Sequence, residues 1–110
     1  MNHGLSESTV ERIRDVLADF PDVEKAVLYG SRAKGNHRPS SDIDLTLYGR
    51  KLGQSQLARI DAALDDLLLP YKIDLSEMSS LTHPALLDHI RRVGMVFYEK
   101  SFMPRETFSA

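Results

Sequence analysis

The feature that most constrains the fold is the strict alternation in the segment DIDLTLY, which begins at Asp42. Ile43, Leu45 and Leu47 alternate with residues that are mostly polar. Successive side chains of a β-strand point to opposite faces, so this pattern predicts a strand with one face packed in the core. It also predicts that Asp42 and Asp44 lie together on the other face.

Apolar periodicity predicts the elements around this strand. Ser8 and Glu11 have the spacing of a capping box, which favours a helix start at Ser8. The segment GSRAKGNHRPSS, beginning at Gly30, is too rich in Gly, Asn, Pro and Ser for a regular element. We expect helices from Ser8 to Phe20, Ser55 to Leu68 and Pro84 to Val93, and strands from Val23 to Tyr29, Asp42 to Tyr48, Lys72 to Glu77 and Met95 to Tyr98.

This order predicts one small α/β (α+β) domain, with a mixed sheet of three or four strands and helices packed on one face. A chain of 110 residues has room for a single domain, 1–110, with a core over about 8–99. The tail 100–110 is expected to be loose, although the apolar Phe102, Met103 and Phe108 could pack on the domain or dock a partner.

Composition excludes several classes of partner. The formal net charge of −2 argues against a protein that coats nucleic acid. No apolar run approaches the ~20 residues of a membrane-spanning helix, so no membrane partner is expected. The residues from Met1 to Glu7 lack the apolar stretch of a signal peptide, and cysteine is absent. We therefore expect a cytoplasmic protein.

The chemistry is expected at Asp42 and Asp44. Two carboxylates on one face of a strand repel unless a positive charge lies between them or one is protonated. Hard divalent cations meet that requirement, and oxygen ligands select two Mg²⁺ ions, with Mn²⁺ as an alternative. Magnesium shares its coordination shell with phosphate oxygens, so such sites usually process phosphates.

The loop that precedes the carboxylates can hold phosphates. Gly30 has no side chain to obstruct a phosphate, and Ser31 can cap a short helix over Arg32–Lys34 that Gly35 closes. The main-chain N–H groups at such a helix start attract anions. Arg32, together with Lys34 and Arg38, makes the loop locally basic.

Each part of this pattern has a simpler explanation when taken alone. An Asp-x-Asp on a strand is often a solvated face, and a Gly-Ser is usually a turn. The combination Gly-Ser-x₁₀-Asp-x-Asp is much rarer, and it lies in a strand–loop–strand context. The four histidines lack ligand spacing and are expected at the surface; only His37 lies in the loop, where it could reach a ligand.

The segment LYGSRAKGNHRPSSDIDLTL resembles the signature of the DNA polymerase beta-type nucleotidyltransferase superfamily, and most of all its minimal (MNT) branch. The resemblance covers about residues 10–98. It implies the fold of that superfamily and places a third carboxylate at Asp74, in the segment LPYKIDLSEM.

The resemblance also implies roles for the matched residues. Gly30 and Ser31, with Arg32 beside them, would bind the nucleotide phosphates. Asp42 and Asp44 would bind both metals. Asp74 would bind the catalytic metal and orient or deprotonate the attacking hydroxyl.

The partner is implied by the resemblance alone. Minimal members are typically encoded beside a small helical HEPN-type or substrate-binding protein, and they look like antitoxins that AMPylate a HEPN toxin. This implies transfer of AMP from ATP, or from another nucleoside triphosphate, to a partner tyrosine. Two alternatives are a nucleotide-binding, neutralising subunit with little turnover and an aminoglycoside-type enzyme. Asp74 argues against the first, and the lack of a second, drug-binding domain argues against the other.

Overall fold

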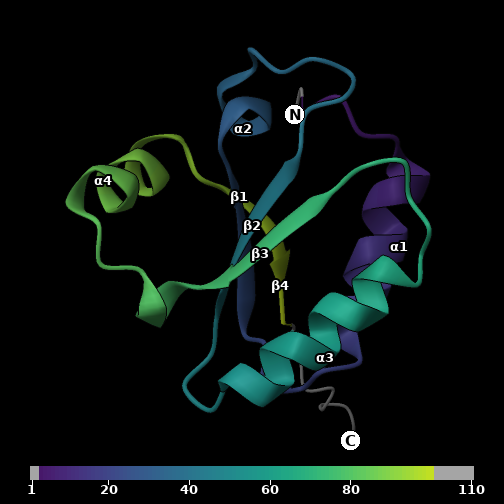
Figure 1. The fold of residues 1–110 in the computed structure, drawn as a ribbon, viewed down its shortest axis with the longest axis vertical. Coiled ribbons are helices and arrows are strands. Elements are labelled where there is room, and N and C mark those ends of the chain that lie inside the picture. Colours follow the sequence, from purple (N-terminus) through teal and green to yellow (C-terminus); the bar gives the residue numbers. More distant parts are fainter. Residues whose placement is uncertain (1–2, 101–110) are drawn as a thin grey trace, which may run out of the picture.

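The computed structural model describes residues 3–100, and Figure 1 shows their fold. All the predicted helices and strands occur, with ends shifted by a few residues. The expected tail beyond Lys100, with Phe102, Met103 and Phe108, lies outside the described residues. The elements are α1 (Glu7–Ala18), β1 (Lys25–Tyr29), α2 (Ser31–Lys34), β2 (Ile43–Tyr48), α3 (Gln54–Asp65), β3 (Ile73–Glu77), the 3₁₀ turn η1 (Met78–Ser80), α4 (Pro84–Val93) and β4 (Met95–Glu99).

The four strands form one mixed sheet in the order β3-β2-β1-β4. Strand β1 pairs antiparallel with β2 and with β4, whereas β2 and β3 are parallel. The predicted mixed sheet is confirmed. The apolar segment ending at Tyr29 is central as expected, and the strand from Met95 is at the edge.

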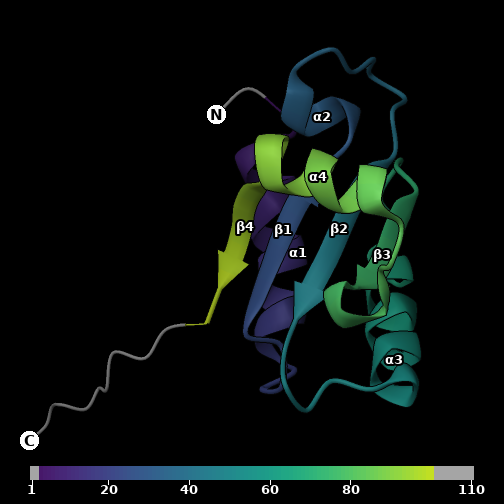
Figure 2. The same ribbon diagram turned by 90° about the vertical axis from the view of Figure 1, so that its left-hand side faces the viewer.

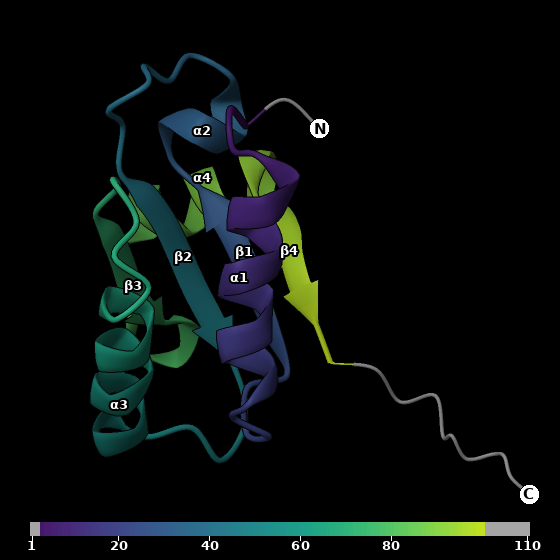
Figure 3. The ribbon, with the colours of Figure 1, turned by 90° about the vertical axis from the view of Figure 1, so that its right-hand side faces the viewer.

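Helices α1 and α3 cover one face of the sheet (Figure 3). The alternation of β2 turns its three aliphatic side chains, all fully buried, toward these helices. The core between the two layers consists of Val10, Ile13, Leu17, Val23, Ala26, Leu28, Ile43, Leu45, Leu47, Leu52, Ile60, Leu64 and Phe97.

Helix α4 crosses the opposite face (Figure 2), so the expectation that the helices pack on one face holds for α1 and α3 only. The cause is an apolar residue on that face of β1. Val27 is buried there, and a Cβ atom added at Gly94, which follows α4, would lie 2.8 Å from its Cγ1 atom. Thr46 also faces this side and is fully buried, although its position in the alternating pattern is a polar one. Within residues 3–100, no helix is long and apolar enough to cross a bilayer.

The first helix begins at Glu7, one residue before the predicted start at Ser8. Ser6 is its N-cap, and the Thr9 N–H donates a hydrogen bond of 3.1 Å to Ser6 Oγ. The expected capping box at Ser8 and Glu11 is therefore wrong, because Ser8 already lies inside α1 and is exposed. Both serines precede the same apolar stripe, so the sequence allowed either start.

This cap gives a direct test. We expect Ser6→Ala to lower the free energy of unfolding by about 1 kcal/mol, because the orphan N–H of Thr9 loses its acceptor. Ser8→Ala should change it by less than about 0.5 kcal/mol, since alanine is the better helix former. Urea denaturation of both variants measures the difference. Equal losses in the two variants would contradict the assigned cap.

Candidate active site

The sheet brings Asp44 and Asp74 side by side. They are partners in the parallel register of β2 and β3, and Tyr29 of β1 is the antiparallel partner of Asp44. The three residues therefore form a row across the sheet on the face opposite the main core. Asp42 is exposed and directly precedes β2. The sequence did not single out Tyr29, because its place in the row depends on strand pairing.

The carboxylates repel one another. Burial, and then the negative charges of Asp74 and Asp42, raise the pKa of Asp44 to about 6. Burial also raises the pKa of the Tyr29 hydroxyl, and the Asp44 and Asp74 carboxylates add to the rise. A cation at this row would relieve the repulsion.

The donor chemistry fits a divalent metal ion. Carboxylate oxygens are hard ligands of the kind that Mg²⁺ and Mn²⁺ prefer. In the described part of the chain, no three acidic or histidine side chains are already gathered as a ready-made metal site. Asp44 and Asp74 are neighbours by strand register, and Asp42 is exposed just before β2.

Gly30 joins the loop to this row. It has a φ of +78°, which glycine adopts without strain, and it is the N-cap of α2. A side chain here would collide with Oδ2 of Asp44, so only glycine lets the backbone pass this close to the carboxylate. Ser31 is the first residue of α2 and not its cap, and no side chain caps this helix. The first N–H groups of α2 have no partner within the helix.

Arg32 has a structural position that the sequence did not predict. Its side chain is 1% exposed. Its guanidinium donates to the carbonyl oxygens of His3, Pro39 and Ser41 at 2.8–3.1 Å and lies over the Tyr71 ring, 4.9 Å from the ring centroid. The guanidinium is therefore committed to closing the loop, and the role predicted for Arg32 in nucleotide binding now rests on its main-chain N–H.

His89 reaches the same loop from α4. The Gly30 N–H donates a hydrogen bond of 3.0 Å to His89 Nε2, and the imidazole meets the Tyr29 ring edge-on, with centroids 6.2 Å apart. The expectation of surface histidines is wrong for His89, which is half-buried and makes these contacts, and for His3, which is buried. A contact between residues 59 positions apart leaves no spacing signal in the sequence. His37 packs near Gly4, where a Cβ atom would collide with its ring.

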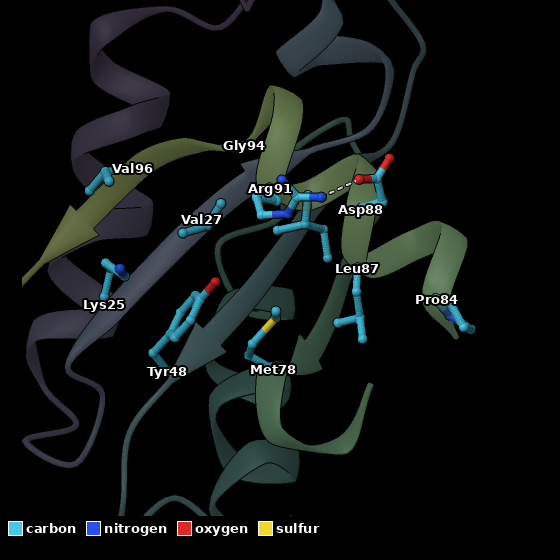
Figure 4. A pocket seen from close by; sticks show the side chains of 11 residues that line it. Lys25, Val27, Tyr48, Met78, Pro84, Leu87, Asp88, Arg91, Gly94 and Val96 are labelled. Atoms are coloured by element: carbon cyan, nitrogen blue, oxygen red, sulfur yellow. Dashed lines mark hydrogen bonds and ion pairs between the residues drawn. The ribbon is translucent and has the colours of Figure 1, made fainter. Parts of the chain in front are cut away.

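A groove of about 720 Å³ lies on the same face, between α4 and the sheet (Figure 4). Its lining is largely apolar, and Val96 at one side is 49% exposed. Asp88 and Arg91 form an ion pair on the α4 side. The sheet face that carries the carboxylates is therefore only partly covered by α4.

These features agree with comparisons to known proteins. Residues 11–102 match the family model described as polymerase beta, nucleotidyltransferase. The match covers most of the chain, so the protein belongs to the polymerase beta nucleotidyltransferase family. No protein of curated function matches the sequence.

Solved structures of toxin–antitoxin complexes share the fold. A complex with AMP-PNP has a TM-score of 0.67 and 21% identity over 84% of this chain and 74% of that chain. The tri-AMPylated HEPN toxin of Shewanella oneidensis with its MNT antitoxin has a TM-score of 0.65 and 18% identity over 87% and 74%. A nucleotidyltransferase fold from Sulfolobus solfataricus has a TM-score of 0.51 and 16% identity over 83% and 77%.

The contacts of Arg32 give one prediction. Arg32→Met should lower the free energy of unfolding by about 3 kcal/mol, because buried carbonyl oxygens lose their donors. Lys34→Met, an exposed change in the same short helix, is the control and should change it by less than about 0.5 kcal/mol. Chemical denaturation measures both. A stable Arg32→Met variant that loses only nucleotide affinity would instead indicate that the guanidinium binds the ligand.

The carboxylate repulsion gives a second prediction. The pKa of Asp44 is about 6 in the folded protein. Since it is near 3.9 in an unfolded chain, the folded state binds this proton more tightly. This contribution to stability is present at low pH and is lost as the pH rises through about 6.

Thermal unfolding in EDTA tests this contribution. Asp44→Asn should be more stable than the wild type at about pH 7.5, where Asp44 is charged, and the difference should shrink toward about pH 5. Asp15→Asn, an exposed change on α1, is the control and should show no such pattern. A pH-independent difference for Asp44→Asn would contradict the assignment.

Proposed function

We propose that this protein transfers AMP from ATP to a tyrosine hydroxyl of a small helical HEPN-type partner in the cytoplasm, and so acts as an antitoxin. The observation that carries the proposal is the pairing of Asp44 with Asp74 beside the Gly30 turn. Membership of the nucleotidyltransferase family supports the reaction type. Two structures of similar fold support the choice of donor and partner. One is a toxin–antitoxin complex with AMP-PNP, and the other contains a tri-AMPylated HEPN toxin with its MNT antitoxin.

The donor half of the reaction uses the loop and the carboxylates. The main-chain N–H groups after Gly30 and the Ser31 hydroxyl would bind the β- and γ-phosphates. Asp42 and Asp44 would hold two divalent cations, with Asp74 as a further ligand of one. Such ions neutralise charge on the attacking and leaving oxygens when bound.

The acceptor half uses Asp74 and the open sheet face. The acceptor oxygen forms a bond to the α-phosphorus as the bond from that phosphorus to the pyrophosphate oxygen breaks. Asp74 is exposed on an edge strand, where it can orient the hydroxyl and take up its proton. The main contribution of the protein is the alignment of the two reacting groups.

Labelled nucleotide tests the activity. The purified chain is incubated with Mg²⁺, α-labelled ATP and the HEPN-type protein encoded beside it. We expect label on the partner with α-labelled ATP and none with γ-labelled ATP, because the α-phosphate alone is transferred. Parallel reactions with α-labelled GTP, CTP and UTP test the choice of base.

Asp44→Asn should reduce this transfer by on the order of 10³-fold, because the residue that binds both metals loses its charge. Asp15→Asn is the matched control and should keep full activity. Wild-type turnover in Asp44→Asn would overturn the assignment of the site. Tight nucleotide binding without transfer to any partner would instead favour the nucleotide-binding, neutralising subunit.

A further inference from the structure

The hydrogen bond between His89 and Gly30 links two parts of the molecule that are distant in sequence. His89 lies in the second half of α4, and Gly30 is the first residue after β1. The Gly30 N–H donates to His89 Nε2 at 3.0 Å. The bond requires Nε2 to carry no proton, so the neutral imidazole has its hydrogen on Nδ1.

One further contact holds the imidazole in place. Its edge-on packing with Tyr29 fixes the ring against the last residue of β1. The neighbours of His89 do not compete for Gly30, since the Asp88 carboxylate accepts hydrogen bonds from both Arg91 and Arg92. The imidazole is thus the group of α4 that holds the loop.

The hydrogen bond from Gly30 to His89 restrains the backbone at a residue with an unusual conformation. Gly30 has a positive φ, lies against the Asp44 carboxylate and directs the chain into α2. Glycine has the largest conformational freedom of any residue, so an unrestrained Gly30 would lose more entropy when a ligand fixed the loop. A hydrogen bond to its N–H reduces that loss in advance.

We propose that His89 is a positioning residue for the triphosphate. It holds the Gly30 peptide in the orientation that places the start of α2 above Asp44, and it acts through Gly30 without touching the substrate. This inference rests on the proposed function only in taking Gly30 and Ser31 as the phosphate-binding turn. The contact itself can be tested without any nucleotide.

Nuclear magnetic resonance tests the contact directly. A hydrogen bond between a backbone N–H and an imidazole nitrogen transmits a nitrogen–nitrogen coupling. In the uniformly ¹⁵N-labelled, nucleotide-free protein at about pH 8, where imidazoles are ordinarily neutral, we expect this coupling between Gly30 N and His89 Nε2. Its absence, or a resonance showing that Nε2 carries the hydrogen, would overturn the proposal.

Three substitutions distinguish the effect of the hydrogen-bond acceptor from the effect of ring packing. His89→Phe keeps an aromatic ring beside Tyr29 but has no acceptor. His89→Gln can place its amide oxygen near the position of Nε2, whereas the amide of His89→Asn is too short to reach it. His83→Phe is the control, because His83 is exposed at the N-cap of the same helix.

Calorimetry with Mg²⁺ and a non-hydrolysable ATP analogue measures the effect on binding. We expect the Kd to rise roughly fivefold in His89→Phe and His89→Asn, the factor typical of one lost neutral hydrogen bond. His89→Gln should restore it to within about twofold, and His83→Phe should match the wild type. With the partner present, KM for ATP should rise in His89→Phe while kcat changes little, as expected when uniform binding is lost.

The outcomes separate this inference from the proposed function. A wild type that shows the coupling but binds no triphosphate overturns the proposed function. A wild type that binds the analogue, with a folded His89→Phe variant that binds equally well, overturns the role of His89. Thermal unfolding identifies a variant that has failed to fold. A loss in His89→Gln as large as that in His89→Phe would show that an acceptor atom at this position does not restore binding, and it also overturns the proposal.

Discussion

Burial of one face of β2 fixes the register on which the site depends. Ile43, Leu45 and Leu47 are fully buried against α1 and α3. A slip of one residue would expose all three side chains and turn Asp44 into the core. Three such side chains contribute ~5–9 kcal/mol by burial. The negative charges of Asp74 and Asp42 contribute to the raised pKa of Asp44, so the carboxylates repel one another. The apolar face therefore holds Asp44 and Asp74 together against their repulsion.

The sequence predicted the features that leave a local pattern, such as strand alternation, helical periodicity or a short motif. Alternation predicted β2 and the face of Asp44, and helical periodicity predicted the three long helices. The motif predicted Gly30 and Ser31 as a turn beside the acids. The family resemblance placed a third carboxylate at Asp74, but the parallel β2–β3 register that pairs it with Asp44 was seen only in the structure. The other features were predictable because each depends on neighbours within a few residues or on a recognisable signature.

The features that the sequence did not predict are contacts at long range. Arg32 looked like a ligand-binding cation, but its guanidinium is buried among carbonyl oxygens from two other segments. His89 looked like a solvated side chain, but it accepts a hydrogen bond from a residue 59 positions away. The expectation of helices on one face missed α4, which packs over the buried Val27 on the other face (Figure 2). No local pattern distinguishes these arrangements from the simpler ones.

The loop between β1 and β2 contains little regular structure, so its order must come from such contacts. Arg32 fastens its far end through Ser41, the residue before Asp42. His89 fastens its near end through Gly30. Two polar side chains, one buried in the loop and one on α4, therefore restrain the two ends of the segment between Gly30 and Asp42. Helix α4, which carries His89, also borders the open groove. The same helix thus contacts the turn proposed to bind the donor and borders the sheet face proposed to receive the acceptor.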